Sequence, residues 1–269
     1  MKVFKALTIA GSDSGGGAGI QADVKTFQEL GVYGMTAITA ITAQNTTGVQ
    51  GVYPVSVEGI AKQIDSIGTD LTPDAVKTGM LFNSEIIKVV AKKITQYQWS
   101  NLVIDPVMIA KGGSPLLQAE AIEALKDYLL PIATVITPNI PEAEVISGIK
   151  ITNLSERKEA AKLIYNLGAK NVMIKGGHEE TDQMIDLLYD GNRFFQFESK
   201  RIATKNTHGT GCTFSAAITA ELAKGKNIVD SISVAKHFIQ AAIEDDLRIG
   251  TGHGPTNHWA YNKRGALCK

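Results

Sequence analysis

The segment Asn206-Thr207-His208-Gly209-Thr210-Gly211-Cys212-Thr213 decides how the fold of this sequence of 269 residues is interpreted. Its two glycines, one residue apart, allow the backbone to bend tightly and to expose its N–H groups. The run that follows, residues 213–222, predicts a helix. A glycine loop that opens a helix is a ready anion site, because its free N–H groups and the positive end of the helix dipole point the same way. The segment therefore predicts a site for a phosphate, or for the charge that develops when a phosphoryl group is transferred.

Cys212 stands at the expected start of this helix, where a helix N-terminus can lower the pKa of a thiol and make it a usable base or nucleophile. The alternative is a structural role, because cysteine is often a small buried hydrophobe. The flanking Gly-Thr-Gly favours a chemical role. For the neighbouring His208 a structural role is favoured, since a Cys–His dyad also needs an orienting partner. Cys268 is expected to be inert.

The bulk composition excludes several classes of protein. Hydrophobic residues make up 44% of the sequence, which is ample for one large core. Lys and Arg together number 27, as do Asp and Glu, so the net charge is zero and no basic stripe suggests a nucleic-acid partner. The apolar stretches are too short for a membrane span, and the N-terminal one is too short for a signal peptide. With only two cysteines a disulfide framework is not expected, and a reducing cytoplasm is the expected setting.

Short β-branched runs alternate with longer segments of helical period along the sequence. These runs are apolar on both faces, as expected of strands in a buried parallel sheet. They are residues 6–10, 34–43, 75–78, 102–105, 134–137 and 171–175. The alternation predicts an α/β fold with a mostly parallel central sheet and helices on both of its faces.

The segments between the strands have amphipathic patterns. Ile20, Val24, Phe27 and Leu30 share one helical face, and Gly31 follows as a C-cap. Residues 84–94 and 155–167 repeat this pattern. Each such segment is therefore expected to cover the sheet with its apolar side.

Residues 184–202 depart from the alternation of strands and helices. Asp190-Gly191 stands between two β-rich runs there and predicts an antiparallel hairpin. The glycine loop and two helices, to about Leu247, are expected after it. No linker, low-complexity tract or fixed-period repeat divides the sequence. Residues 1–269 are therefore expected to form a single domain.

Polar or glycine clusters follow nearly every expected strand, at the edge where ligands bind in parallel α/β sheets. The first, residues 11–19, is either a tight turn or a backbone cradle for a small substrate. Asp105 and Glu142 are candidate Mg²⁺ ligands, although a lone Asp at a strand end can simply cap a turn. Lys175 can neutralise a phosphate, although a lone Lys is often just solvated. Phosphoryl transfer needs an anion hole, a cation, metal carboxylates and a base together, so their joint presence favours that chemistry.

Several of these motifs resemble those of the ribokinase-like kinases. Within that group, the sequence is similar to the hydroxymethylpyrimidine/phosphomethylpyrimidine kinase family of thiamine biosynthesis. The resemblance extends over residues 6–255. The motifs that carry it are residues 10–14, 16–23, 77–80, 105–108, 139–142 and 206–213.

The resemblance implies a three-layer ribokinase-like fold and an ATP- and Mg²⁺-dependent kinase. Cys212 would be the catalytic base, where the wider group has Asp, and the backbone from Gly209 to Cys212 would stabilise the transferring phosphoryl group. Asp105 and Glu142 would serve Mg²⁺. ATP would contact Lys175, Asn139, Thr207, Gly209 and Gly211. The substrate ring would lie among Gly11, Ala18, Asp23, Gln44, Met80 and Val107.

The resemblance is compatible with more than one substrate. The leading expectation is phosphorylation of 4-amino-5-hydroxymethyl-2-methylpyrimidine and of its monophosphate. Gln44 favours this substrate, because its amide can both donate and accept hydrogen bonds at an aminopyrimidine edge. A pyridoxal/pyridoxine kinase of the same subfamily is the alternative, and a sensor that binds a nucleotide or a vitamin without catalysis is a third. Met80 and Val107 fit core packing as well as a flat wall for a ring. A homodimer is also implied.

Overall fold

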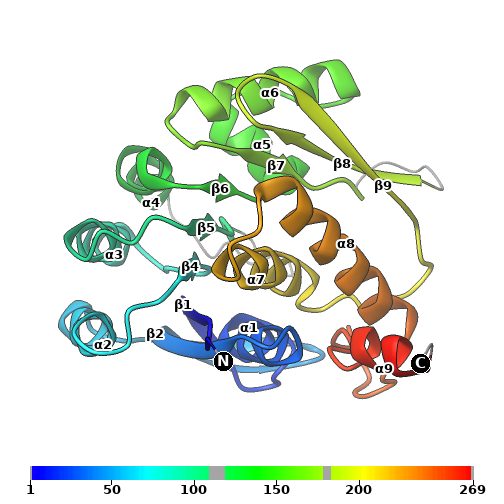
Figure 1. Cartoon of the computed structure of the whole chain (residues 1–269), viewed down its shortest axis with the longest axis horizontal. Helices are drawn as coiled ribbons and strands as arrows, with labels where there is room; N and C mark the ends of the chain where they lie inside the picture. Colours follow the sequence, from blue (N-terminus) through cyan, green and yellow to red (C-terminus); the bar gives the residue numbers. More distant parts are fainter. Residues whose placement is uncertain (1, 109–118, 178–182, 268–269) are drawn as a thin grey trace.

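The computed structural model describes residues 2–108, 119–177 and 183–267, and Figure 1 shows their strands in one sheet between two layers of helices. Six strands are parallel: β1 (Lys5–Asp13), β2 (Tyr33–Asn45), β4 (Ala75–Thr78), β5 (Leu102–Ile104), β6 (Val135–Ile136) and β7 (Val172–Ile174). Three antiparallel strands are added at the edges: β3 (Gly48–Pro54), β8 (Gln183–Tyr189) and β9 (Phe194–Lys200). In the described part of the chain the strand order is β3-β2-β1-β4-β5-β6-β7-β8-β9. The predicted α/β fold with a mostly parallel sheet is confirmed.

Helices cover both faces of this sheet. One face carries α2 (Val57–Gly68), α3 (Ser84–Gln96), α4 (Ala119–Ala124), α5 (Ile140–Ser147) and α6 (Leu154–Asn166), with a π turn at Leu125–Leu129 and a 3₁₀ turn at Leu130–Ile132 after α4. The other face carries α1 (Gly19–Glu29), α7 (Thr210–Ala223) and α8 (Ile228–Glu244). A last helix, α9 (Ala260–Leu267), packs against α8.

Alternate side chains of each central strand belong to different hydrophobic cores. In β5, Leu102 and Ile104 pack with the α3 side, whereas Val103 packs with the α7 side. All three side chains are buried. This placement explains why the parallel strands are apolar on both faces, since a strand between two helical layers has no face in water.

The hairpin is confirmed at the predicted turn. Asp190 accepts hydrogen bonds from the N–H groups of Asn192 (2.9 Å) and Arg193 (2.8 Å), and Gly191 adopts a positive φ of 92°. β8 then pairs with β9 along its whole length and with β7 over residues 187–189. The hairpin therefore continues the sheet beyond its parallel part.

Some elements were not predicted. β3 is a partly exposed edge strand that contains two glycines, so it lacks the apolar pattern of the buried strands. α2 begins directly after it, where the Ser56 side chain accepts from the N–H of Gly59, and it leaves only Ile60 and Ile64 buried. None of the described helices is long and apolar enough to cross a membrane. The single-domain expectation stays a prediction.

Gly209 joins the two halves of the fold. It is the N-cap of α7 and has a φ of 80°, in the left-handed region. A Cβ built on it would overlap the carbonyl oxygen of Gly17, in the loop after β1. Only glycine therefore fits both the backbone conformation and the close contact between these loops.

We predict that Gly209→Ala destabilises the fold strongly, whereas Gly225→Ala serves as the matched control. Gly225 has a similar φ of 84°, but a Cβ there would meet nothing within 4 Å. The control should lose about 1 kcal/mol from backbone strain alone. Gly209→Ala should lose at least about 2 kcal/mol more, because the loops must move apart. Equal losses in the free energy of unfolding, measured with urea, would contradict the steric account.

Candidate active site

The ends of the parallel strands and the start of α7 enclose a cavity of about 740 Å³. Its volume lies in the upper part of the range for small-molecule sites. Of the expected site residues, the structure brings the following to its wall: Gly11, Ala18, Gln44, Met80, Asp105, Val107, Asn139, Glu142, Lys175, Thr207, Gly209, Gly211 and Cys212. The sheet edge thus brings together residues that lie far apart in the sequence.

The glycine-rich loop after β1 is organised by the carboxylate of Asp13. Oδ2 accepts from the N–H groups of Gly17 (3.0 Å) and Ala18 (2.8 Å), and Oδ1 accepts from Gly15 (2.8 Å). The N–H of Gly16 bonds to the Asp13 carbonyl at 2.9 Å. Because these N–H groups are taken within the loop, the structure favours the tight turn over the backbone cradle for this part of the loop.

Burial alone would raise the pKa of Asp13, but hydrogen bonds outweigh it. The ring of His208 donates to the carboxylate, and so do the backbone N–H groups of Ala18 and Gly15. Together they hold the pKa of Asp13 below its ordinary value. Asp13 is therefore an ionised carboxylate at neutral pH.

The predicted anion site falls at the first turn of α7. The N–H of Thr213 donates to the Gly209 carbonyl at 2.9 Å, which is the first hydrogen bond of the helix ladder. The N–H groups of Gly211 and Cys212 come before it, where a helix has no carbonyl of its own to offer them. A Cβ at position 211 would lie 3.3 Å from Lys175 Nζ and 3.7 Å from Asp105 Oδ2. The glycine therefore lets the helix end approach a charged pair closely.

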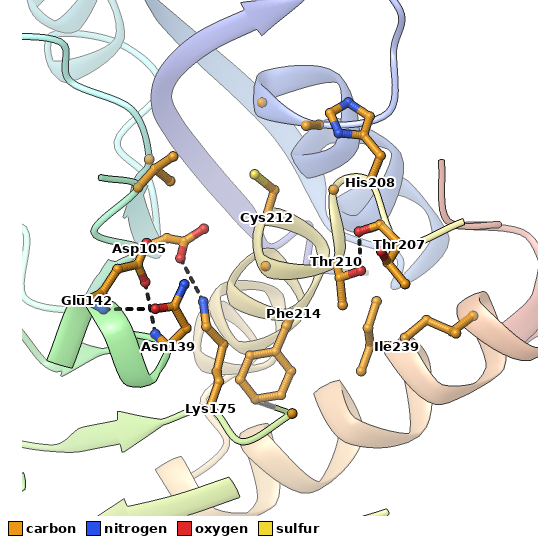
Figure 2. A pocket seen from close by; sticks show the side chains of 18 of the residues that line it. Asp105, Asn139, Glu142, Lys175, Thr207, His208, Thr210, Cys212, Phe214 and Ile239 are labelled. Carbon is orange, nitrogen blue, oxygen red and sulfur yellow. Dashed lines mark hydrogen bonds and ion pairs between the residues drawn. The ribbon is translucent and has the colours of Figure 1, made fainter. Parts of the chain in front are cut away.

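Cys212 is half-buried in the third position of α7, and Figure 2 shows its thiol between the Asp105–Lys175 pair and His208. Burial raises the pKa of the Cys212 thiol to about 12, against the lowering effect of Lys77. The negative charge of Asp105 raises it further. The expectation that the helix N-terminus lowers this pKa is therefore wrong for the protein alone, because burial and neighbouring carboxylates outweigh the dipole.

Asp23 does not line the cavity, where it was expected to contact the substrate. Its side chain is fully buried below the cavity wall, where it accepts from Lys77 Nζ at 2.9 Å and from the Thr8 hydroxyl at 2.6 Å. Burial would lower the pKa of Lys77, but the charge of Asp23 raises it above its ordinary value. Asp23 is thus the counter-ion of a buried lysine, since α1 turns this side chain toward the sheet.

Lys175 and Asp105 form an ion pair on the cavity wall, with Nζ 3.1 Å from Oδ1 (Figure 2). The Ser215 hydroxyl lies 3.3 Å from Oδ2 of the same carboxylate. Burial would lower the pKa of Lys175, but Asp105 and Glu142 raise it above its ordinary value. Lys175 is therefore a fixed positive charge beside the start of α7.

Asn139 and Glu142 form a capping box at the start of α5. The N–H of Glu142 donates to Asn139 Oδ1, and the N–H of Asn139 donates to Glu142 Oε2, both at 2.9 Å. Burial raises the pKa of Glu142 against the effect of Lys175. The helix cap holds the carboxylate on the same wall as Asp105, and it also occupies the side-chain oxygen of Asn139.

The end of the cavity at the hairpin contains residues that the sequence analysis missed. Lys236 of α8 lies 2.6 Å from Asp186 Oδ2 and 2.9 Å from the Ser199 hydroxyl. Asp186 Oδ1 also accepts from the N–H of Gly176 at 2.6 Å. A lysine inside an apolar helical run was the available signal, because a charge at such a position needs a partner.

The sequence model of the phosphomethylpyrimidine kinase family matches residues 13–257. The chain belongs to this family. Hydroxymethylpyrimidine/phosphomethylpyrimidine kinase of Bacillus subtilis is 57% identical over 268 residues, which cover 99% of this chain and 98% of that relative. A thiamine biosynthesis bifunctional protein of Geobacter sulfurreducens is 50% identical over 252 residues, which cover 94% of this chain and 51% of that relative.

A solved structure supports the fold. An ADP complex of Bacillus subtilis pyridoxal kinase is similar with a TM-score of 0.90 and 47% identity, covering 97% of this chain and 100% of that one. The ribokinase-like fold expected from the resemblance is confirmed. The chain is a kinase of the phosphomethylpyrimidine kinase family.

We predict that Asp105→Asn makes the Cys212 thiol more reactive. Removing this negative charge should lower the pKa of the thiol, so a larger fraction is thiolate at a given pH. In a Cys268→Ser background Cys212 is the single thiol, and its alkylation by iodoacetamide is measured at about pH 8.5, near the ordinary pKa of cysteine. The rate should rise several-fold. The exposed Asp70→Asn serves as the control, and an equal rise there would contradict the electrostatic cause.

Proposed function

We propose that this kinase transfers the γ-phosphoryl group of ATP to 4-amino-5-hydroxymethyl-2-methylpyrimidine, and then a second one to the monophosphate, in thiamine biosynthesis. The observation that carries the proposal is the cavity wall on which Cys212 and the N-terminus of α7 meet the Lys175–Asp105 pair. An anion site, a cation and a proton acceptor on one wall are what phosphoryl transfer requires. Membership of the family and the 57% identical relative support this substrate.

The transferring phosphoryl group is placed at the first turn of α7. The N–H groups of Gly211 and Cys212 point out of the helix end, where the dipole favours negative charge. Lys175 lies beside them and exchanges its contact with Asp105 for the phosphates of ATP. These donors are held by the fold before the reaction, so they stabilise the transition state without reorganisation.

Cys212 is proposed as the base that accepts the proton of the substrate hydroxyl. Its thiol must first lose its own proton, and burial makes this unfavourable in the protein alone. Lys77 is the group that lowers the thiol pKa most, so the buried ammonium stabilises the thiolate. In a loose transition state the hydroxyl proton leaves late, and a well-placed acceptor then matters more than a strong nucleophile.

The donor set fits a Mg²⁺ ion. Among the described residues no group of three or more His, Cys, Asp or Glu side chains could hold a metal, so a site made by protein alone is not present there. Asp105 and Glu142 nevertheless provide carboxylates on one wall, and Mg²⁺ typically takes one or two carboxylates together with substrate phosphates. These two residues would hold the ion, which neutralises phosphate charge when bound.

The substrate end of the cavity has a mostly apolar wall with one amide. Gly11, Ala18, Met80 and Val107 line it beside Gln44. Flat apolar surface suits one face of a ring, and the amide suits the edge of an aminopyrimidine. Pyridoxal is the second candidate substrate, because the similar solved structure is a pyridoxal kinase. The homodimer and the cytoplasmic setting stay predictions, and gel filtration with light scattering tests the first of them.

Cys212→Ala should keep the fold and most ATP binding but lose turnover. Loss of a positioned base should lower kcat by about 10²–10⁴-fold. Circular dichroism and nucleotide titration check the fold and binding. Cys268→Ala is the matched control and should turn over normally. Near wild-type turnover of Cys212→Ala would refute the assignment of the base.

The wild-type enzyme should have a higher kcat/KM for hydroxymethylpyrimidine than for pyridoxal. The reason is that Gln44 pairs with an amino group beside a ring nitrogen, which pyridoxal lacks. Both substrates are compared on one preparation by coupled measurement of ADP release. A clear preference for pyridoxal would assign the chain to the second candidate, and no ATP consumption with either alcohol would favour the sensor.

A further inference from the structure

His208 lines the cavity without a role in the proposed reaction. It lies in the loop before α7, on the far side of Cys212 from the Asp105–Lys175 pair (Figure 2). Its Nε2 meets side chains from two other parts of the chain, at 2.8 Å from Asp13 Oδ2 and 3.3 Å from Gln44 Nε2. The ring thus links the glycine-rich loop to the amide that faces the substrate.

The contact with Asp13 fixes the hydrogen on this ring. An ionised carboxylate only accepts hydrogen bonds, so a nitrogen 2.8 Å from it must carry a hydrogen. This is true of the neutral ring in its Nε2–H form and of the protonated ring. That one hydrogen is directed at Asp13 Oδ2, the nearer of the two atoms, so toward Gln44 the same Nε2 has no lone pair and cannot accept.

The hydrogen on His208 in turn selects the orientation of the Gln44 amide. The oxygen and nitrogen ends of a carboxamide have nearly the same shape, so the hydrogen-bond network decides which end lies where. A nitrogen of Gln44 opposite Nε2–H would place two donors together. An oxygen in that place is attracted to the positive Nε2–H group, as the longer branch of a three-centre hydrogen bond shared with Asp13, so this side of the amide is assigned as Oε1.

Thr42 selects the same orientation from the other end of the amide. Its hydroxyl has one hydrogen and donates it to the Ser12 carbonyl at 2.8 Å. The hydroxyl oxygen, 3.1 Å from the second end of the Gln44 amide, is then free only to accept. The amide nitrogen belongs at this end, so His208 and Thr42 agree.

We propose that His208 is a specificity-determining positioning residue, which holds the Gln44 amide with its oxygen toward His208 and its nitrogen toward Thr42. Held in this way, the outer edge of the amide offers one acceptor and one donor side by side. That pair matches an exocyclic amino group next to a ring nitrogen, as glutamine matches adenine. The amino group of the substrate lies on the His208 side and the ring nitrogen on the Thr42 side. The inference rests on the proposed aminopyrimidine substrate.

The test compares two alcohols that differ only in the amino group: hydroxymethylpyrimidine and 5-hydroxymethyl-2-methylpyrimidine. The ratio of their kcat/KM values reports how well the amide reads the amino group. His208→Leu removes the donor and should lower this ratio roughly tenfold or more, mainly through a higher KM for the amino substrate. His208→Gln places an N–H near the position of Nε2 and should restore most of the ratio.

A merely structural histidine gives a different result. Loosening of the loops would lower kcat/KM for both alcohols alike and leave the ratio unchanged, and this outcome overturns the inference. Failure of His208→Gln to restore the ratio also overturns it. Turnover of the aminopyrimidine by the wild type separates the two proposals. If this turnover is absent, the proposed function fails and the inference fails with it. If it is present, the results for the His208 variants test the inference alone.

A measurement on the wild-type protein keeps the inference testable if the variants do not fold. Nitrogen-15 NMR of the labelled protein assigns the ring form of His208 from its two nitrogen shifts. A hydrogen on Nε2 is expected, in the neutral or protonated ring. A neutral ring with its hydrogen on Nδ1 would overturn the inference, because Nε2 would then be an acceptor toward Gln44.

Discussion

The close contact between the backbone of Gly209 and the carbonyl of Gly17 is the constraint on which the rest of the site depends. It brings the N-terminus of α7 against the loop after β1, so the proposed anion site and the proposed substrate wall line one cavity. Asp13 maintains the contact from the other side, because its carboxylate holds both its own loop and His208. Neither loop can move without breaking hydrogen bonds of a nearly buried charge, which makes this junction rigid.

Charge around Cys212 is arranged in two layers. Lys77 and Asp23 form a fully buried pair of which only Lys77 reaches the cavity wall, whereas Lys175 and Asp105 form a pair on that wall. In each pair the carboxylate keeps the lysine charged despite burial. The thiol therefore lies near two fixed cations and their counter-ions. Its protonation state depends on which of these charges a bound ligand compensates.

The sequence predicted the parts of the molecule that depend on local pattern. The apolar runs identified the parallel strands, Asp190-Gly191 identified the hairpin, and the glycines before Cys212 identified the start of α7. β3 was not predicted, because an exposed edge strand needs no apolar pattern. The sequence placed the cavity residues at strand ends correctly in most cases, because the ends of parallel strands share one edge of a sheet.

The remaining properties of the site depend on distance and burial. The direction of the Asp23 side chain and the raised pKa of the Cys212 thiol follow from burial and neighbouring charges, which a linear pattern does not contain. The role of Asp13 is similar, because a loop rich in glycine looks the same whether its N–H groups face a ligand or a carboxylate of the loop itself.

The link between Asp13 and His208 also bears on how the protein is made. The two residues are 195 positions apart, so the glycine-rich loop leaves the ribosome long before its partner is synthesised. Contacts of such long range form late in folding. Because Asp13 already binds the N–H groups of its own loop, the loop can keep its shape before His208 is synthesised. The wall that α7 forms is then added when this helix docks against the sheet edge, and α8 supplies further lining residues after it.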